Sequence, residues 1–454
     1  MNHKDSSYFV LLLLILFSFP PIFGFSQDSL FLKSPNNYSV LDTSKAKLLD
    51  SHAKRLYLSR EYEKADSILN IIGMIYYKSF GEGSLEMAEF WHHKGMVSHK
   101  MSKYDFAIEF YKKGLKIRLK LLSNFHHLVA KSYNSIGVSY YSKGDLNSSI
   151  EYYRKALEIR IKVQGEKHKE VASLYNNIGV SYKDNGNLDT SLDYLLKALN
   201  LRLVLFGEEN GEVASSYNNL ANTYEKMGDY ENAKKFTLKS LNIRLALFGE
   251  ENEDVAASYF NLGDFYEKIG EYDDARKIKQ KSLDIYLALF GEENEDVASA
   301  YNNLGNTYET IGDYKEALNN FQKALDIRLR LFGINHKEVA NSFNDLGSFY
   351  QTMGEYDIAL KYKTNALKIL LNIEGKNQFN LSALYNNIAI TLKSLGEFKK
   401  AIEYYLLSLK IKFELLGENH VDVAIGYNNI GIAYGSINEH EKALEYKKRH
   451  WRYF

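Results

Sequence analysis

Apolar and small residues recur along most of the chain at the spacing of paired helices. Tyr301, Leu304 and Tyr308 stand at positions i, i+3 and i+7, which share one face of a helix. A second run with the same spacing follows, and it comprises Tyr314, Ala317, Leu318, Phe321, Ala324 and Leu325. The pattern therefore predicts two successive amphipathic helices within residues 297–333, the second longer than the first.

The residues between the two runs predict a tight turn. Gly312 is suited to end the first helix in a left-handed conformation, which glycine adopts at little cost. Asp313 is followed three residues later by Glu316, and this pair resembles a capping box that starts the second helix. The two helices are therefore expected to run antiparallel.

This helix pair returns every 42 residues. A small residue of the first helix marks each return: Gly95, Gly137, Gly179, Ala221, Gly263, Gly305, Gly347, Ala389 and Gly431. One step back gives Ala53, so we expect about ten units over residues 43–454, with the last one incomplete. A period of about 20–50 residues is typical of a solenoid, in which units are stabilised by stacking on their neighbours. The expected fold is an all-α solenoid that offers a binding surface rather than a catalytic pocket.

The glycine in the middle of the first helix requires a packing explanation. Mid-helix glycine costs about 1 kcal/mol relative to alanine, yet it returns in most units. We expect that the missing side chain lets the first helix approach the second closely.

The recurring residues resemble the tetratricopeptide repeat. The resemblance rests on the run Tyr301-x-x-Leu304-Gly305-x-x-Tyr308, followed by Ala317-x-x-x-Phe321-x-x-Ala324, and it covers about residues 43–448. The period exceeds the usual period of about 34 residues, and the proline expected after the second helix is missing. Both differences, with the run from Gly165 through His168 to Asn176-Asn177-Ile-Gly179, are similar to the kinesin light chain type of repeat. The resemblance implies a right-handed superhelix whose concave face is lined by the first helix of each unit.

Residues 1–26 predict a secretory signal peptide. An apolar run from Tyr8 to Phe17 precedes Gly24 and Ser26, the small residues of a cleavage site before Gln27. An uncleaved membrane anchor is the alternative, although the run is shorter than the ~20 residues that span a bilayer. Residues 27–42 are polar and read as a linker. We therefore expect an exported protein, periplasmic or secreted.

Composition and motifs argue against most other functions. The 57 basic and 57 acidic residues give no net charge that would attract nucleic acid. With no cysteine, thiolate metal sites and disulfides are absent. His92 and His99 lie about 10 Å apart along a helix, too far to share one metal ion. No phosphate loop, nucleophile elbow or His-Glu-x-x-His run appears. We therefore expect that the protein is not an enzyme and that it binds neither a cofactor nor a small-molecule substrate.

A row of asparagines is the leading candidate for a binding site. The resemblance places it on the concave face, and its members are Asn134, Asn176, Asn218, Asn302, Asn344, Asn386 and Asn428. Asparagine is a poor mid-helix residue, so its recurrence indicates a function. Amides both donate and accept, which suits them to bind the backbone of an extended peptide. Alternatively, they bond to the adjacent helix and set the register between units, the role expected for the following row that includes Asn177 and Asn219.

Further candidates lie in the central units of the groove. They are Asn222, Asn306, Glu225, Asp264, Glu267 and Glu309. The four acids favour a partner with some basic residues, whereas ordinary solvated helix surface explains the same charges equally well.

The leading interpretation is an exported, non-catalytic scaffold that binds peptide or protein segments in its concave groove. A membrane protein is one candidate partner. The alternative is the sensory input region of a truncated bacterial signalling protein. It rests on His450, which stands where earlier units have a small residue, so that the last helix ends half-built.

Overall fold

The computed structural model describes residues 43–373, 378–418 and 420–451. Within them the chain forms twenty α-helices and no strand, which confirms the predicted all-α solenoid. The first helices of the units are α2 Thr43–Leu58, α4 Leu85–Lys100, α6 His127–Lys143, α8 Lys169–Asp184, α10 Gly211–Lys226, α12 Glu253–Lys268, α14 Glu295–Ile311, α16 Lys337–Thr352, α18 Gln378–Ser394 and α20 Val421–Ser436. The second helices are α3 Tyr62–Phe80, α5 Tyr104–Leu121, α7 Leu146–Gln164, α9 Leu188–Phe206, α11 Tyr230–Phe248, α13 Tyr272–Phe290, α15 Tyr314–Phe332, α17 Tyr356–Asn372, α19 Phe398–Leu416 and α21 His440–Trp451.

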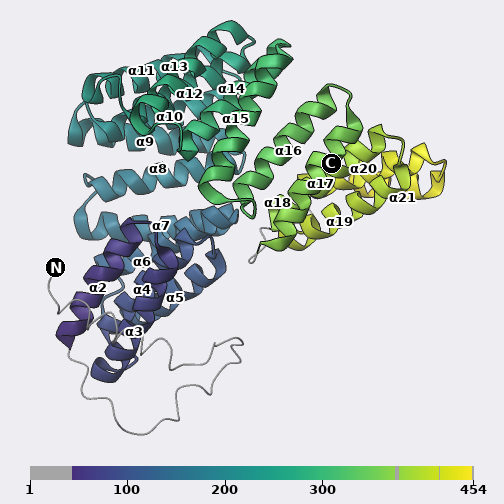
Figure 1. Ribbon diagram of the computed structural model, residues 1–454. Helices are drawn as coiled ribbons and strands as arrows, with labels where there is room; N and C mark the ends of the chain where they lie inside the picture. Colours follow the sequence, from purple (N-terminus) through teal and green to yellow (C-terminus); the bar gives the residue numbers. More distant parts are fainter. Residues whose placement is uncertain (1–42, 374–377, 419, 452–454) are drawn as a thin grey trace, which may run out of the picture.

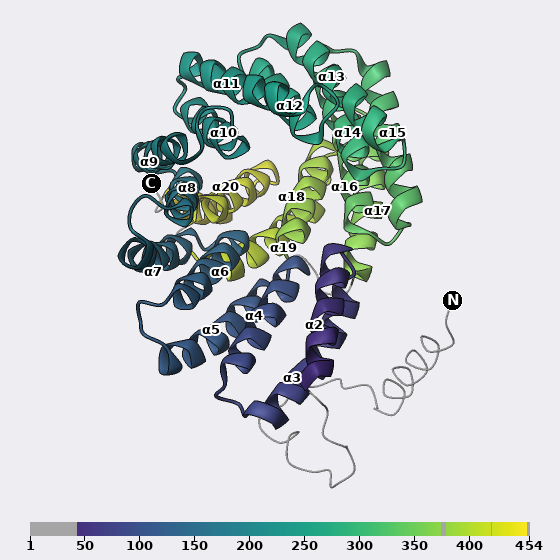
Figure 2. The same ribbon diagram turned by 90° about the vertical axis from the view of Figure 1, so that its left-hand side faces the viewer.

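The helix pairs stack in chain order into a superhelix. Each helix packs against the helix before and the helix after it, from α2 to α21 (Figure 1). Figure 2 shows the first helices, such as α8, α12 and α18, on the inside of the curve and the second helices, such as α9, α13 and α17, on the outside. The first helices therefore line the concave side.

The turn between α14 and α15 is built as its sequence predicts. Gly312 ends α14 in the left-handed conformation, with φ of 89°. The side chain of Asp313 then accepts a hydrogen bond from the backbone nitrogen of Glu316, with 3.2 Å between the two atoms. One exposed N–H at the start of α15 is thereby satisfied.

Histidine and asparagine side chains cap the N-termini of several of the first helices. Nδ1 of His168 accepts from the backbone nitrogen of Glu170 at 3.2 Å, and Oδ1 of Asn294 accepts from that of Asp296 at 2.7 Å. An acceptor at this position caps a helix N-terminus. The histidine of the kinesin light chain type of run is thus a helix cap in this chain.

The mid-helix glycine provides room for a ring from the second helix. A Cβ atom on Gly137 would lie 2.7 Å from Cδ1 of Tyr153, and one on Gly305 would lie 2.9 Å from Cε1 of Phe321. Both rings are buried. The close approach predicted from the glycine row is therefore present in these units.

The predicted signal peptide (1–26) and linker (27–42) lie outside the described residues, as do residues 452–454. Among the helices that are described, none combines the length and the apolar character needed to cross a bilayer. The last of them, α21, has 12 residues, against 19 in α15.

Candidate functional site

The asparagine row lies on the concave-side helices and joins neighbouring units. Oδ1 of Asn176 on α8 accepts a hydrogen bond from Nδ2 of Asn219 on α10, with 2.8 Å between the two atoms. The same bond recurs in three more units, as Asn218 with Asn261 (3.1 Å), Asn344 with Asn387 (3.2 Å) and Asn386 with Asn429 (3.3 Å). At these four units the amides connect adjacent helices, as the register interpretation expects.

This pairing does not by itself occupy the N–H groups of the first-row amides, although the Asn344 side chain also hydrogen-bonds to Asp345. The bond uses the carbonyl oxygen of the first-row asparagine, so it does not consume the two N–H donors of that side chain. All seven members of the row, including Asn134 and Asn428 at its ends, are partly rather than fully buried. A register role and contact with a ligand are therefore compatible in one residue.

Asn302 departs from the pattern of the row. Its partner slot, 43 residues later, holds Asp345 instead of asparagine. Burial raises the pKa of Asp345, and hydrogen bonds from the Asn302 and Asn344 side chains partly offset this rise. Oδ1 of Asn302 is buried and has no hydrogen-bond partner among the described residues. Buried acceptors are rarely left unpaired, so Asn302 is an exception within the row.

Three of the four candidate acids form ion pairs within the chain. Glu225 pairs with Lys268 of the next unit. Nζ of Lys279 lies 2.7 Å from Oδ1 of Asp264 and 2.8 Å from Oε2 of Glu267. These lysines neutralise much of the negative charge, which weakens the expected preference for a basic partner.

The remaining candidates are placed differently. Asn222 and Glu309 are partly buried, and Asn306 is exposed on α14. Among the described residues, no side-chain hydrogen bond joins them to the asparagine bonds described above, and they remain predictions as ligand contacts.

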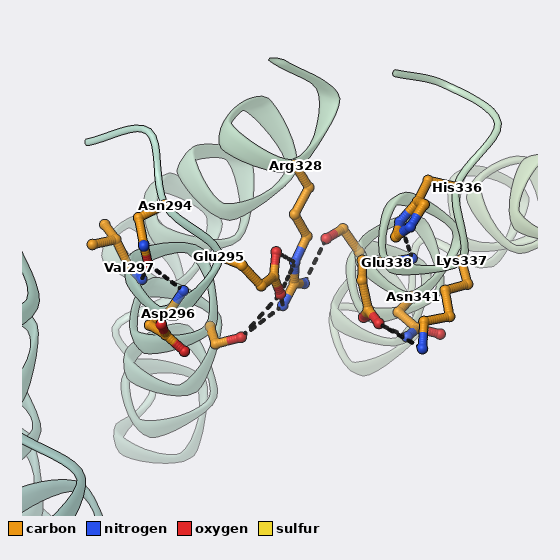
Figure 3. A network of polar contacts seen from close by, with 11 residues as sticks. Asn294, Glu295, Asp296, Val297, Arg328, His336, Lys337, Glu338 and Asn341 are labelled. Atoms are coloured by element: carbon orange, nitrogen blue, oxygen red, sulfur yellow. Dashed lines mark hydrogen bonds and ion pairs between the residues drawn. The ribbon is translucent and has the colours of Figure 1, made fainter. Parts of the chain in front are cut away.

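Buried arginines link neighbouring units, and sequence analysis did not single them out. Arg328 on α15 donates from Nε and Nη2 to Oε1 of Glu295 on α14, at 3.1 and 2.9 Å (Figure 3). Its Nη1 donates to Oγ of Ser342 on α16 at 2.8 Å, and its Nη2 donates to Oγ of Ser299 at 3.1 Å. One side chain therefore joins three successive helices.

A signal for these arginines is present in the sequence. Each bonds to a serine 14 residues later, as Arg118 does with Ser132 (2.7 Å), Arg202 with Ser216 (2.7 Å) and Arg244 with Ser258 (2.6 Å). In two other units both slots change together: they hold Tyr286 with Ala300, and Leu370 with Leu384. Arg160 is the exception among the arginines of this slot, because the residue 14 positions later is a leucine. Joint change at a fixed spacing indicates contact.

The histidines of the first units make polar contacts with nearby side chains. Nδ1 of His99 lies 3.1 Å from Oγ of Ser139, and His93 contacts Asp50 and Glu89. In the part of the chain that the structure describes, no three His, Asp or Glu side chains are grouped to hold a metal ion.

Acid is expected to destabilise the first units through His92. This side chain is 2% exposed, and burial, together with the charges of Lys131 and Arg118, lowers its pKa from 6.5 to about 3. Between these values the unfolded state binds a proton that the folded state does not, so stability falls as the pH falls below 6.5. When the pH is lowered from 7 to 5, the free energy of unfolding should fall by about 2 kcal/mol less in His92→Phe than in the wild type. Urea unfolding at both pH values measures this.

The titration of His93 changes stability with pH in the opposite direction, and His93 is present in both the wild type and His92→Phe. Burial alone would lower its pKa, but hydrogen bonds to Asp50 and Glu89 outweigh burial and raise it. Its contribution is complete below its unfolded pKa and is lost as the pH rises through its folded pKa. An identical change between pH 7 and pH 5 in wild type and His92→Phe would contradict the prediction.

The family of the chain follows from a comparison with known protein families. The tetratricopeptide repeat family matches residues 86–162, 170–246, 212–288, 254–330, 338–412 and 380–450. The chain belongs to the tetratricopeptide repeat family. The fold and the family define a helical repeat scaffold of the protein-binding class. A search of curated proteins finds no match.

Solved structures to which the chain is similar include a putative kinesin light chain with repeats described as similar to tetratricopeptide repeats. BtubC (BKLC) from P. vanneervenii is 24% identical, with 51% of this chain and 92% of that chain covered and a TM-score of 0.43. A Podosopora anserina putative kinesin light chain is 16% identical, with 46% and 99% covered and a TM-score of 0.42. The apo form of RapI is 18% identical, with 82% and 98% covered and a TM-score of 0.48.

Proposed function

We propose that the protein is a non-catalytic scaffold that binds extended peptide or protein segments on the concave side of its superhelix. The observation that carries the proposal is the asparagine row, which places an amide at one position of seven concave-side helices. Membership of the tetratricopeptide repeat family supports it. Neither nucleic acid nor a small-molecule substrate is part of the proposal.

The row has the chemistry needed to hold a peptide backbone. An extended segment presents N–H and C=O groups about every 3.3 Å along its length. Asn176 and Asn218 retain amide donors for the carbonyl groups of such a segment. Because backbone groups are common to all sequences, the scaffold should accept several sequences with similar affinity.

We place the scaffold outside the cytoplasm, after cleavage before Gln27. The apolar run and the small residues of positions 1–26 support this location. The partner is then a protein or peptide of the same compartment, and membrane proteins are among the candidates. N-terminal sequencing of the native protein tests the location: Gln27 as the first residue supports cleavage, whereas an intact N-terminus in the membrane fraction supports the anchored alternative.

Two triple variants separate peptide binding from the register role. Asn176→Ala with Asn218→Ala and Asn386→Ala removes three first-row amides. The matched control, Asn219→Ala with Asn261→Ala and Asn429→Ala, breaks the same three interhelical bonds and keeps the first row. Peptides selected on the wild-type chain from a displayed random library serve as probes in fluorescence polarisation. The first triple should weaken binding about 100-fold, at about 1 kcal/mol per lost bond, and the control by less than about threefold.

Circular dichroism confirms that both triples keep their helices before binding is compared. Equal weakening by both would show that the row serves only the register between units. Failure to select any peptide on the wild-type chain would overturn the proposal itself.

A further inference from the structure

Two buried lysines occupy a position of the second helix that other units give mostly to apolar side chains. At 42-residue steps that position holds Leu69, Tyr111, Tyr153, Leu195, Thr237, Phe321 and Tyr405, and in the last unit an exposed lysine, Lys447. Lys279 on α13 is 4% exposed and Lys363 on α17 is 2% exposed. Their aliphatic stems take the place of the ring, because a Cβ atom on Gly347 would lie 2.6 Å from Cγ of Lys363. Each ammonium group then lies between the concave-side helices of two units.

The ammonium group of Lys279 is compensated by carboxylates. Asp264 and Glu267, both on α12, lie within 2.8 Å of its Nζ. The hydroxyl of Thr307 on α14 donates a hydrogen bond to Glu267 and completes the cluster. A buried cation with two such partners is electrostatically satisfied.

The surroundings of Lys363 repeat this cluster two units later without its carboxylates. Gln351 stands where Glu267 stood, Ser348 where Asp264 stood, and Thr391 where Thr307 stood. Nζ of Lys363 donates to Oε1 of Gln351 at 2.6 Å, to Oγ1 of Thr391 at 2.9 Å and to the backbone oxygen of Asn387 at 3.4 Å. Two negative charges have been exchanged for neutral groups around the same buried cation.

The charge of Lys363 therefore has no counterion within the described residues. Its contacts there are neutral oxygens, which satisfy its hydrogen bonds but not its charge. Burial lowers the pKa of Lys363 to about 8. A buried, uncompensated ammonium group is unfavourable, and a carboxylate brought within reach would relieve the cost.

A carboxylate can reach this position from the concave side. In the Lys279 cluster the Asp264 side chain is 38% exposed, so its carboxylate lies at the solvent boundary. The equivalent Ser348 is exposed and much shorter. Asn387, whose backbone oxygen faces Lys363, also donates through its side chain to Asn344 of the asparagine row. The open position therefore adjoins the row.

We propose that Lys363, with Gln351, Ser348 and Thr391, forms a site for a carboxylate of the bound peptide. The carboxylate is an aspartate or glutamate side chain or the C-terminus of the peptide. The inference rests on the proposed function, in which the asparagine row holds the backbone beside this site. It assigns an acidic preference to the part of the groove between α16 and α18, opposite to the mildly basic preference expected from the central acids.

The test supplies the missing carboxylate from within the chain. A displayed random library is selected on the wild type and on Gln351→Glu, which copies Glu267. Selected peptides are then synthesised with aspartate or asparagine at the enriched position, and with a free or amidated C-terminus. The wild type should bind the carboxylate form at least about tenfold more tightly, and Gln351→Glu should abolish that difference. The aspartate and amide arms identify which carboxylate is bound.

A reciprocal variant transfers the preference to another unit. Asp264→Ser with Glu267→Gln gives Lys279 the neutral surroundings of Lys363 and should create a second acid-preferring position. If the wild type binds acid and amide forms equally, or if Gln351→Glu keeps the preference, the inference fails while the proposed function stands. If neither protein selects peptides, both fail. The wild-type comparison of the two peptide forms decides the inference even if a variant does not fold.

Discussion

Replacing Arg328 by methionine is expected to lower the free energy of unfolding by about 3 kcal/mol, because it leaves a partly buried ion pair without its cation. The guanidinium group bonds to Glu295, Ser299 and Ser342, and so connects α14, α15 and α16. Methionine keeps much of the apolar stem but satisfies none of these oxygens. Urea denaturation, with hydrogen exchange to locate the loosened interface, measures the loss.

Arg244→Met is the matched control. Arg244 occupies the same slot and bonds to Ser258 at 2.6 Å, but among the described residues it forms no ion pair as close as that of Arg328. Its loss should cost only about 1 kcal/mol, the value of one hydrogen bond. Equal losses in the two variants would show that the Glu295 pair adds nothing to stability.

Gly137→Val is expected to destabilise the third unit, formed by α6 and α7, by about 3 kcal/mol through overpacking. The new Cβ would lie 2.7 Å from Cδ1 of Tyr153 and 2.8 Å from its Cε1. Tyr153 is 3% exposed, so its ring has little room to move, and α6 must separate from α7. Denaturation measures the loss, and hydrogen exchange should increase most in these two helices.

A double-mutant cycle with Tyr153→Ala separates the clash from other effects of valine. This substitution removes the ring that the new Cβ would meet. Tyr153→Ala should be destabilising in the wild type and much less so in the Gly137→Val background, with a coupling above about 1 kcal/mol. Additive losses would refute the explanation by ring contact.

The fold was predictable because its determinants are local and repeat. The spacing of Tyr301, Leu304 and Tyr308, the glycine at 312 and the cap at Asp313 each act within one helix or turn. Because the pattern repeats every 42 residues, a helix or turn that is ambiguous in one unit can be recognised from the equivalent residues of the other units.

The candidate site was predictable in position but not in its bonds. The asparagine row is visible as one residue type at one spacing, and the register alternative for it was also open. Which atom of Asn176 is used depends on Asn219, 43 residues away on another helix. Likewise, a lysine in an apolar slot is visible at Lys363, but the lack of a counterion depends on the residues of α16 and α18 that surround it.

The helix pairs, their 42-residue period, the close approach at the glycines and the asparagine row follow from the amino-acid sequence alone, because helix periodicity and turn chemistry act over a few residues. The packing of the helices in space decides which amides pair, that Arg328 joins three helices, and that Lys279 has carboxylate partners whereas Lys363 has none among the described residues. These contacts join side chains from different helices, and their geometry depends on how the stacked units curve.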